Sequence, residues 1–334
     1  MRGECGYPRT ARARRSGSRR STPCAGPKRW ISRIGFASSK RATRCAPVPD
    51  ALRGRAPAKV NLVLEVLGAR EDGFHEIDTI FQELELADEV AVTFGGPAGV
   101  RADGPFAAGT PTDPTNLAWR AAALLALRTG QSAESISIRL TKNIPPAGGL
   151  GGGASDAATV LRLLAGVWPG ATDAILRQVG GEIGSDEGFF LVGGTARGTG
   201  RGEQVEPLSS LPPHDVVLFV PAFSMERKTA RMFAALDQHA FDPGGIASRF
   251  AAESPQQIGS ADVFNAFERV GFDLFPALAS LWQDLEARTG EPVRLAGAGP
   301  TLFWIGPSGS GEAIARAAAG AGCTVIPTRT ATVQ

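Results

Sequence analysis

Stretches with different hydrophobic periods follow one another along the chain and predict a mixture of strands and helices. Strict or partial alternation of apolar and polar residues predicts strands, whereas apolar residues spaced by three or four predict helices. Strands are expected at 59–68, 79–94 (one or two), 135–140, 215–221, 293–306 (two around a glycine turn) and 323–328, with short strands within 184–203. Helices are expected at 116–128, after the glycine run at 148–153, and at 172–179, 225–237, 262–270, 277–288 and 312–319.

Local residue chemistry fixes the ends of the first of these helices. Asn116 is a good N-cap, Arg128 suits a last helical turn, and Gly130 is a typical stop. In the helix after the glycine run, apolar residues on one face predict a buried side: Ala157, Val160, Leu161 and Leu164. The order of elements lacks regular strand–helix alternation and shows no internal repeat, so it predicts an α+β fold in two lobes.

The charge divides the chain into two parts. Residues 1–55 hold 15 Lys and Arg against two acids, whereas the rest holds 20 bases against 31 acids. The first part is rich in Arg, Ser, Gly and Pro and has no strand or helix period, so residues 1–54 are expected to form a disordered tail. It fits a start codon assigned too far upstream, an organelle transit peptide, or a basic arm for a polyanion.

Composition narrows the class of the remaining chain. Of the 334 residues of the whole chain, tail included, 43% are hydrophobic, and no apolar run approaches a transmembrane length. Outside the tail Cys323 is the only cysteine, so no disulfide framework is expected and a cytoplasmic location fits. With three histidines and no Cys/His cluster, a zinc site is not expected.

A glycine run in front of an apolar helix is the strongest chemical signal. Five of the six residues from Gly148 to Gly153 are glycine, in "IPPAGGLGGGASDAAT" (144–159). Glycines let the backbone approach a ligand and point N–H groups at it, and the helix that follows adds its dipole. The run therefore predicts an anion site, most often for phosphate. The alternative is a flexible turn with no ligand.

Two known phosphate motifs fit the run poorly. A Walker loop needs Lys and Ser or Thr after its last glycine, and here Ala154 and Ser155 follow. A dinucleotide fingerprint fits as Gly149-x-Gly151-x-x-Ala154, but it requires a tight turn directly after a strand. "TKNIPPA" intervenes instead. A nicotinamide-dependent oxidoreductase is the alternative function from a different class, and the missing tight strand-to-helix turn argues against it.

Four segments resemble the GHMP kinases. "PPAGGLGGGASDAA" (145–158) is similar to the phosphate loop of that family, and "LAGAGPTLFWIG" (295–306) to its C-terminal glycine motif. "PAKVNL" (57–62) and "DGFHEIDTIFQ" (72–82) resemble the branch whose members phosphorylate 4-diphosphocytidyl-2-C-methyl-D-erythritol, more than homoserine, mevalonate or galactose kinases. The resemblance covers about residues 55–330. It implies an ATP-binding lobe at 55–212, similar to the second domain of ribosomal protein S5, and a ferredoxin-like lobe at 213–334.

The resemblance implies transfer of a phosphoryl group from ATP to the 2-hydroxyl of this acceptor, in the non-mevalonate route to isoprenoid precursors. Lys59 and Asp186 take the positions of the catalytic lysine and aspartate. Mg²⁺ is the implied metal, with ligands that stay unknown. The implied ATP-binding residues are Pro145, Pro146, Ala147, Gly148, Gly149, Leu150, Gly151, Gly152, Gly153, Ala154 and Ser155. Ser155 is a candidate for phosphate or Mg²⁺, whereas Asp156 is favoured as a helix cap.

For the acceptor, the resemblance implies binding by Asn61, Phe74, His75, Thr229 and Phe233. Phe74 and Phe233 are expected to sandwich the cytosine, with His75 at a base edge. The alternative for Phe233 is plain core packing. The family often has Val-Pro after the catalytic aspartate, where this chain has Glu187 and Gly188. Glu187 either adds a like charge beside Asp186, which raises a carboxyl pKa, or points away.

The remaining alternatives concern substrate and partners. Another GHMP kinase of the homoserine or mevalonate type needs no base sandwich, which favours the cytidyl acceptor. Only small-molecule partners are expected for the folded part, with no nucleic acid or membrane, and a monomer or homodimer. The location is cytoplasmic, or plastid if residues 1–54 are a transit peptide.

Overall fold

The computed structural model describes residues 51–332. The predictions for the basic tail therefore lie outside the described residues, except at its end. Residues 51–54, which the sequence assigned to the tail, already form the start of the first strand and pair with its neighbour, for example Ala51 with Thr93. The folded part therefore begins at least four residues earlier than expected.

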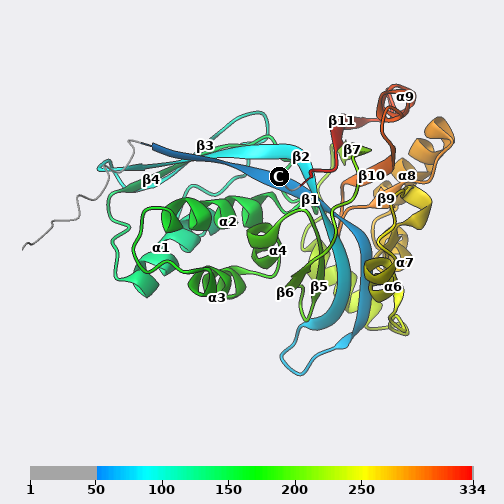
Figure 1. The fold of residues 1–334 in the computed structure, drawn as a ribbon. Coiled ribbons are helices and arrows are strands. Elements are labelled where there is room, and N and C mark those ends of the chain that lie inside the picture. Colours follow the sequence, from blue (N-terminus) through cyan, green and yellow to red (C-terminus); the bar gives the residue numbers. More distant parts are fainter. Residues whose placement is uncertain (1–50, 333–334) are drawn as a thin grey trace, which may run out of the picture. The chain divides into compact units, whose positions relative to one another are not determined.

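A mixed sheet of seven strands forms the first half of the fold (Figure 1). Its main path runs β3-β4-β2-β1-β8, and β5 and β6 extend from β2. The bounds are β1 (Ala51–Ala69), β2 (His75–Phe94), β3 (Gly99–Asp103), β4 (Ile136–Thr141), β5 (Thr195–Thr199), β6 (Gln204–Pro207) and β8 (Phe264–Asn265). The long β1 and β2 pair antiparallel along most of their length. Because β1 is long, its Ala56 packs in the core under the helix layer, whereas its Leu64 packs in the core of the C-terminal half.

Helices cover one face of this sheet (Figure 1). They are α1 (Leu117–Thr129), α2 (Gly152–Ala165), α3 (Asp173–Ile183) and α4 (Glu187–Val192). The apolar face predicted for α2 is confirmed, because all four of its residues are fully buried. They pack in one core with apolar residues of the sheet, among them Val92 and Ile138. Burial of such side chains is the main favourable term that holds the helix layer on the sheet.

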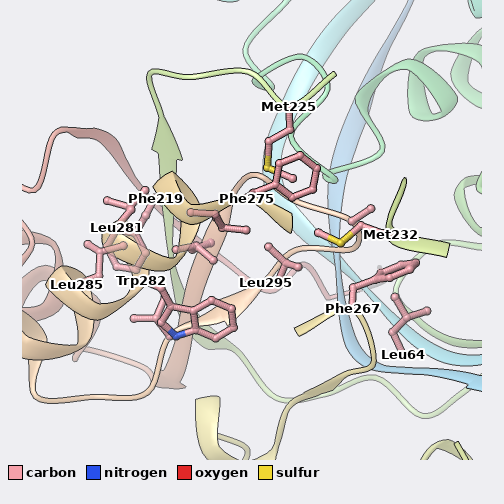
Figure 2. Close-up of a cluster of buried hydrophobic side chains, with 14 of the residues drawn as sticks. Leu64, Phe219, Met225, Met232, Phe267, Phe275, Leu281, Trp282, Leu285 and Leu295 are labelled. Atoms are coloured by element: carbon pink, nitrogen blue, oxygen red, sulfur yellow. The ribbon is translucent and has the colours of Figure 1, made fainter. Parts of the chain in front are cut away.

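A second sheet, of order β11-β7-β10-β9, forms the other half. Its strands are β7 (His214–Pro221), β9 (Arg294–Leu295), β10 (Leu302–Pro307) and β11 (Cys323–Arg329). The helices of this half are α5 (Lys228–Leu236), α6 (Ile246–Glu253), α7 (Glu268–Leu274), α8 (Pro276–Thr289) and α9 (Gly311–Ala317), with a 3₁₀ turn η1 (Ser260–Asp262). Figure 2 shows its core, a cluster that includes Trp282 and Leu295 and extends to Leu64 of β1, which lies beside Phe267.

The two halves share elements and core. β8 comes from the C-terminal half of the chain but pairs with β1 of the first sheet. A further core joins Val60 and Ile80 of the first sheet to Leu218 and Phe303 of the second. We keep the division into two lobes between residues 212 and 213 as a proposal. β8 is the exception, because it belongs to the second lobe by sequence but pairs with a strand of the first.

Several predicted elements are confirmed and two are wrong. The side chain of Asn116 accepts a hydrogen bond from the backbone N–H of Ala118 at 2.9 Å, and Gly130 ends α1 with a φ of 68°. The segment 184–203 was predicted as short strands, but its first part forms α4. The predicted helix at 262–270 is instead η1, β8 and the start of α7.

No helix between residues 51 and 332 combines the length and the hydrophobicity that a bilayer crossing requires.

Candidate active site

The glycine run forms a loop that is wedged between two other backbone segments. Its Leu150 carbonyl accepts from the Lys59 N–H at 2.9 Å, and its Gly148 carbonyl accepts from the Thr301 N–H at 3.3 Å. At Gly149, where φ is +87°, an added Cβ would lie 1.9 Å from the carbonyl oxygen of Ala296. Part of the glycine content therefore serves close packing of the chain on itself, which the sequence alone did not indicate.

Two cavities lie on either side of this loop. The larger, of about 750 Å³, contains Lys59 and Asp186, and the smaller, of about 400 Å³, contains most of the glycine run. Gly149 and Gly151 line both, so the loop is the wall that the two cavities share. The predicted ATP-binding residues from Pro145 to Ala154 line the smaller cavity.

The loop leads into the N-terminus of α2, whose first residues carry two buried polar side chains. Asp156 was expected to cap the helix, but that interpretation is wrong. The N-cap residue is Gly151, so no side chain caps this helix. Asp156 instead pairs with Lys142 inside the protein. Ser155 is fully buried and lines neither cavity, and its Oγ has no hydrogen-bond partner within residues 51–332.

Lys142 joins two buried carboxylates at the floor of the smaller cavity. It forms ion pairs with Asp88 and Asp156, and Asp88 also accepts from the backbone N–H groups of Asn143 and Ile144. Burial raises the pKa of Asp156, and the like charge of Asp88 adds to the rise. Sequence reasoning missed Lys142, although a lysine between a strand and the glycine run was a usable signal.

The chemical end of the larger cavity brings together residues that are far apart in the sequence. Lys59, on β1, points its Nζ at Asp186 Oδ2 at 3.5 Å and donates to Asn61 Oδ1 at 2.8 Å. Asn61 in turn donates to the Thr79 hydroxyl at 2.8 Å. Asp186 is 37% exposed and stands at the start of α4. A buried ammonium and an accessible carboxylate thus share one end of the cavity.

Glu187, next to Asp186, points away from this end. It is 1% exposed and lines neither cavity, and an added Cβ at Gly184 would lie 2.5 Å from its Oε2. The pKa of Glu187 is raised to about 7, chiefly by burial. The negative charge of Asp186 adds to the rise, and a hydrogen bond from the backbone N–H of Glu187 opposes it. Of the two alternatives left open by the sequence, the structure shows the one in which the side chain turns inward.

Replacing Glu187 by glutamine is expected to stabilise the protein at alkaline pH. A free Glu carboxyl has a pKa of 4.5, so the folded protein holds a proton between pH 4.5 and 7 that the unfolded chain has lost. Ionisation of Glu187 therefore costs up to about 3 kcal/mol above pH 7. Urea unfolding at pH 5 and pH 8 should show a gain for Glu187→Gln that is larger at pH 8.

The exposed Glu253 of α6 provides a matched control for that measurement, because Glu253→Gln removes a carboxylate at the surface. An equal effect of Glu187→Gln at both pH values would contradict the buried, neutral carboxyl at pH 5.

The aromatic end of the larger cavity differs from the expected sandwich. Phe74 is 48% exposed with the Arg201 guanidinium over its ring at 4.6 Å. The His75 ring stacks on Phe233 with centroids 4.2 Å apart, and its Nε2 lies 2.7 Å from Asp237 Oδ1. His75 therefore covers one face of the Phe233 ring. Thr229 lines the same cavity.

Lys228 is a second lysine in the larger cavity that sequence reasoning missed. It is the first residue of α5, it is half-buried, and its ammonium donates to the Gly299 carbonyl. The pKa of Lys228 is lowered to about 8, chiefly by burial and also by the positive charge of Lys59, while the charge of Asp186 opposes the shift.

Comparisons with known proteins bear on the family and the fold of the chain. Residues 116–194 match the GHMP kinases N terminal domain. A 4-diphosphocytidyl-2-C-methyl-D-erythritol kinase of Dehalococcoides mccartyi is 41% identical over 254 residues, which are 75% of this chain and 87% of that protein. The Bacillus subtilis kinase of the same name is 37% identical over 256 residues, 75% of this chain and 86% of that protein.

Solved structures show the same fold. A crystal structure of 4-(cytidine 5'-diphospho)-2C-methyl-D-erythritol kinase has a TM-score of 0.67 and 33% identity, covering 84% of this chain and 100% of that chain. A homoserine kinase from Cytophaga hutchinsonii has a TM-score of 0.60 at 16% identity, covering 90% and 97%, and shares the fold alone. The predicted α+β GHMP kinase fold is confirmed. The chain belongs to the GHMP kinases, in the family of 4-diphosphocytidyl-2-C-methyl-D-erythritol kinases.

Proposed function

We propose that the protein transfers the γ-phosphoryl group of ATP to the 2-hydroxyl of 4-diphosphocytidyl-2-C-methyl-D-erythritol, in the non-mevalonate route to isoprenoid precursors. The observation that carries the proposal is the pair of cavities that share Gly149 and Gly151 as a wall. A phosphoryl transfer needs two substrates whose reacting atoms meet in line. One cavity for each substrate, with a thin glycine wall between them, provides such a meeting point.

The smaller cavity is the proposed ATP site. Backbone N–H groups of the glycine loop and the N-terminus of the 14-residue α2 favour phosphate there. Asn116 and Lys142 line the same cavity beyond the loop, but their polar groups are already bound, Asn116 to Ala118 and Lys142 to Asp88 and Asp156, so they shape this part of the cavity. The small glycines keep the backbone close to the ligand without side chains in the way.

Mg²⁺ is part of the proposal as the ion that accompanies ATP and neutralises phosphate charge when bound. Residues 51–332 contain no group of three acidic, His or Cys side chains that could hold a metal. Mg²⁺ that accompanies a nucleotide is often held chiefly by phosphate oxygens and water. The unpartnered Ser155 Oγ is the hydroxyl that we propose for the phosphate or the ion. Because Ser155 is fully buried and lines neither cavity, this role requires the loop to move when ATP binds.

Asp186 and Lys59 are the proposed catalytic residues. The Asp186 carboxylate accepts the proton of the acceptor hydroxyl or orients that hydroxyl. The Lys59 ammonium, 3.5 Å away, stabilises the negative charge that develops on the attacking oxygen and the transferred group. Asn61, which bonds Lys59 and Thr79 and lines the same cavity, is the residue that we propose for the methylerythritol portion.

The aromatic end of the larger cavity is the proposed cytosine site. Phe74 and the stacked pair His75 and Phe233 present ring faces and a polar edge for a base. A sandwich between Phe74 and Phe233 requires a free face of Phe233, and His75 covers one of its two faces. Thr229 lies on the same helix as Phe233 and lines the cavity nearby.

Replacing Phe74 by alanine is expected to raise the KM for the acceptor roughly tenfold and to leave kcat nearly unchanged. Stacking of a base on an aromatic ring contributes about 1–3 kcal/mol. Phe74 is proposed to bind the base, whereas Lys59 and Asp186 are proposed to carry the chemical step, so kcat should be spared. Leu127→Ala is the matched control, because Leu127 is also a large exposed side chain but lines neither cavity. An unchanged acceptor KM in Phe74→Ala would refute the cytosine site.

ADP release by the full chain tests the substrate. With ATP and Mg²⁺, we expect turnover with 4-diphosphocytidyl-2-C-methyl-D-erythritol and at most weak turnover with homoserine or mevalonate. Turnover with either small acceptor, and none with the cytidyl acceptor, would assign the chain to another type of GHMP kinase.

A further inference from the structure

The larger cavity contains two lysines with unequal surroundings. Lys59 has a carboxylate partner in Asp186. Lys228 donates to the neutral carbonyl of Gly299, and no carboxylate within residues 51–332 lies at ion-pair distance from its ammonium. A carbonyl satisfies one N–H of the ammonium but leaves its charge uncompensated. A half-buried cation in this state favours an anionic ligand.

The other charged residues that line the cavity already have partners. Asp186 faces Lys59, and Asp237 bonds His75. Arg201 covers Phe74 and lies 3.8 Å from Glu203. Lys228 is therefore the cationic group of this cavity that is left for a bound anion.

The position of Lys228 on α5 indicates which anion it meets. Further along the helix, Phe233 stacks on His75 and Asp237 bonds the same ring, so the later part of α5 faces the aromatic end. The start of α5 faces the chemical end: Lys228 bonds Gly299, and the neighbouring Gly297 lies beside the Lys59 ammonium. Lys228 thus stands between the proposed base site and the catalytic pair.

We propose that Lys228 binds the diphosphate of the cytidyl acceptor. This rests on the proposed function, because in such an acceptor the diphosphate joins the nucleoside to the sugar alcohol. A base held by the aromatic end and a hydroxyl held by Lys59 and Asp186 leave the diphosphate between them, where Lys228 lies. The ammonium lines the larger cavity and not the smaller one, which favours the acceptor over ATP as the source of the phosphate.

A structural role for Lys228 predicts a different behaviour of variants. If the side chain only holds the Gly299 carbonyl, glutamine at this position retains a donor and preserves the protein. If the charge binds phosphate, Lys228→Gln and Lys228→Met lose that function alike, and Lys228→Arg retains most of it. Arg231→Gln is the matched control, because it removes a cation from the same helix at a residue that does not line the cavity.

Calorimetric binding of CDP and of cytidine to the full chain, without ATP, tests the proposal. We expect wild type to bind CDP more tightly than cytidine. Lys228→Met and Lys228→Gln should weaken CDP binding about tenfold or more and leave cytidine binding unchanged. Arg231→Gln should bind both as wild type does.

Three results would overturn the assignment. One is unchanged CDP affinity in Lys228→Met, and another is an equal loss for cytidine, which would indicate a disturbed base site. The third is a loss of affinity for a non-hydrolysable ATP analogue in place of CDP, which would assign Lys228 to the nucleotide donor. If wild type binds neither CDP nor cytidine, the cytidyl acceptor itself is wrong and the assignment falls with it.

Discussion

Replacing Asp186 by asparagine is expected to lower kcat by about 10²- to 10⁴-fold while ATP still binds. A positioned general base contributes a factor of this size, and asparagine keeps the shape of the side chain but cannot accept the proton. Asp186 lines the larger cavity and not the smaller one, so the ATP site should be unaffected. Steady-state kinetics and binding of a non-hydrolysable ATP analogue measure the two quantities separately.

Stability should fall in this variant, because the carboxylate is partly exposed but its loss leaves the buried Lys59 ammonium without a counter-charge. Asp273→Asn, an exposed aspartate of α7 that lines neither cavity, is the control. Full activity of Asp186→Asn would remove Asp186 from the mechanism.

Replacing Gly149 by alanine is expected to be the most damaging single change in the glycine loop. The added Cβ would lie 1.9 Å from the Ala296 carbonyl oxygen, and the backbone φ of +87° disfavours any L side chain. Either the loop or the segment with Ala296 must move. The loop is the wall between the cavities and the Ala296 segment lies against it, so either movement alters the cavities. We expect a loss of several kcal/mol in the free energy of unfolding and a large increase in the KM for ATP.

Gly153→Ala is the matched control within the same run. Gly153 lies in the first turn of α2, and an added Cβ would meet only a Leu117 methyl group at 3.4 Å, an ordinary contact. Alanine is favoured over glycine in a helix by up to about 1 kcal/mol, so this variant should be as stable as wild type or slightly more stable. Equal behaviour of the two variants in urea unfolding would contradict the wedged loop.

Local residue chemistry was sufficient for part of the fold. The ends of α1 follow from Asn116 and Gly130, whose side-chain and backbone preferences act within a few residues. The apolar face of α2 follows from its spacing alone. Such features need no knowledge of distant segments.

Elements that depend on distant partners could not be predicted. α4 has only six residues and sits among glycines, but its Phe189 and Phe190 are buried, and Phe189 stacks on Phe81 of β2. Phe264 and Asn265 lie in a helix-like pattern, but they pair with β1, and the Asn265 amide donates to two carbonyls of the 295–297 segment. Tertiary contacts override local propensity in both cases.

In the candidate site, too, some features could be predicted from the sequence and others depend on distant contacts. The resemblance to a family indicated Lys59, Asp186 and the loop, but the 3.5 Å approach of the two side chains depends on the fold. The inward turn of Glu187 depends on space beside Gly184, which is a tertiary feature. Lys142 could have been noticed from its place between a strand and the glycine run, whereas Lys228 carries no sequence signal until its surroundings are known.

The central claim is that this chain phosphorylates one hydroxyl of a cytidyl sugar alcohol. The most direct measurement is ³¹P NMR of the full chain with ATP, Mg²⁺ and 4-diphosphocytidyl-2-C-methyl-D-erythritol. We predict one ADP per acceptor consumed, and a new phosphomonoester at the 2-hydroxyl with the acceptor diphosphate intact. ADP and inorganic phosphate with an unmodified acceptor, or a phosphate at another position, would contradict the account.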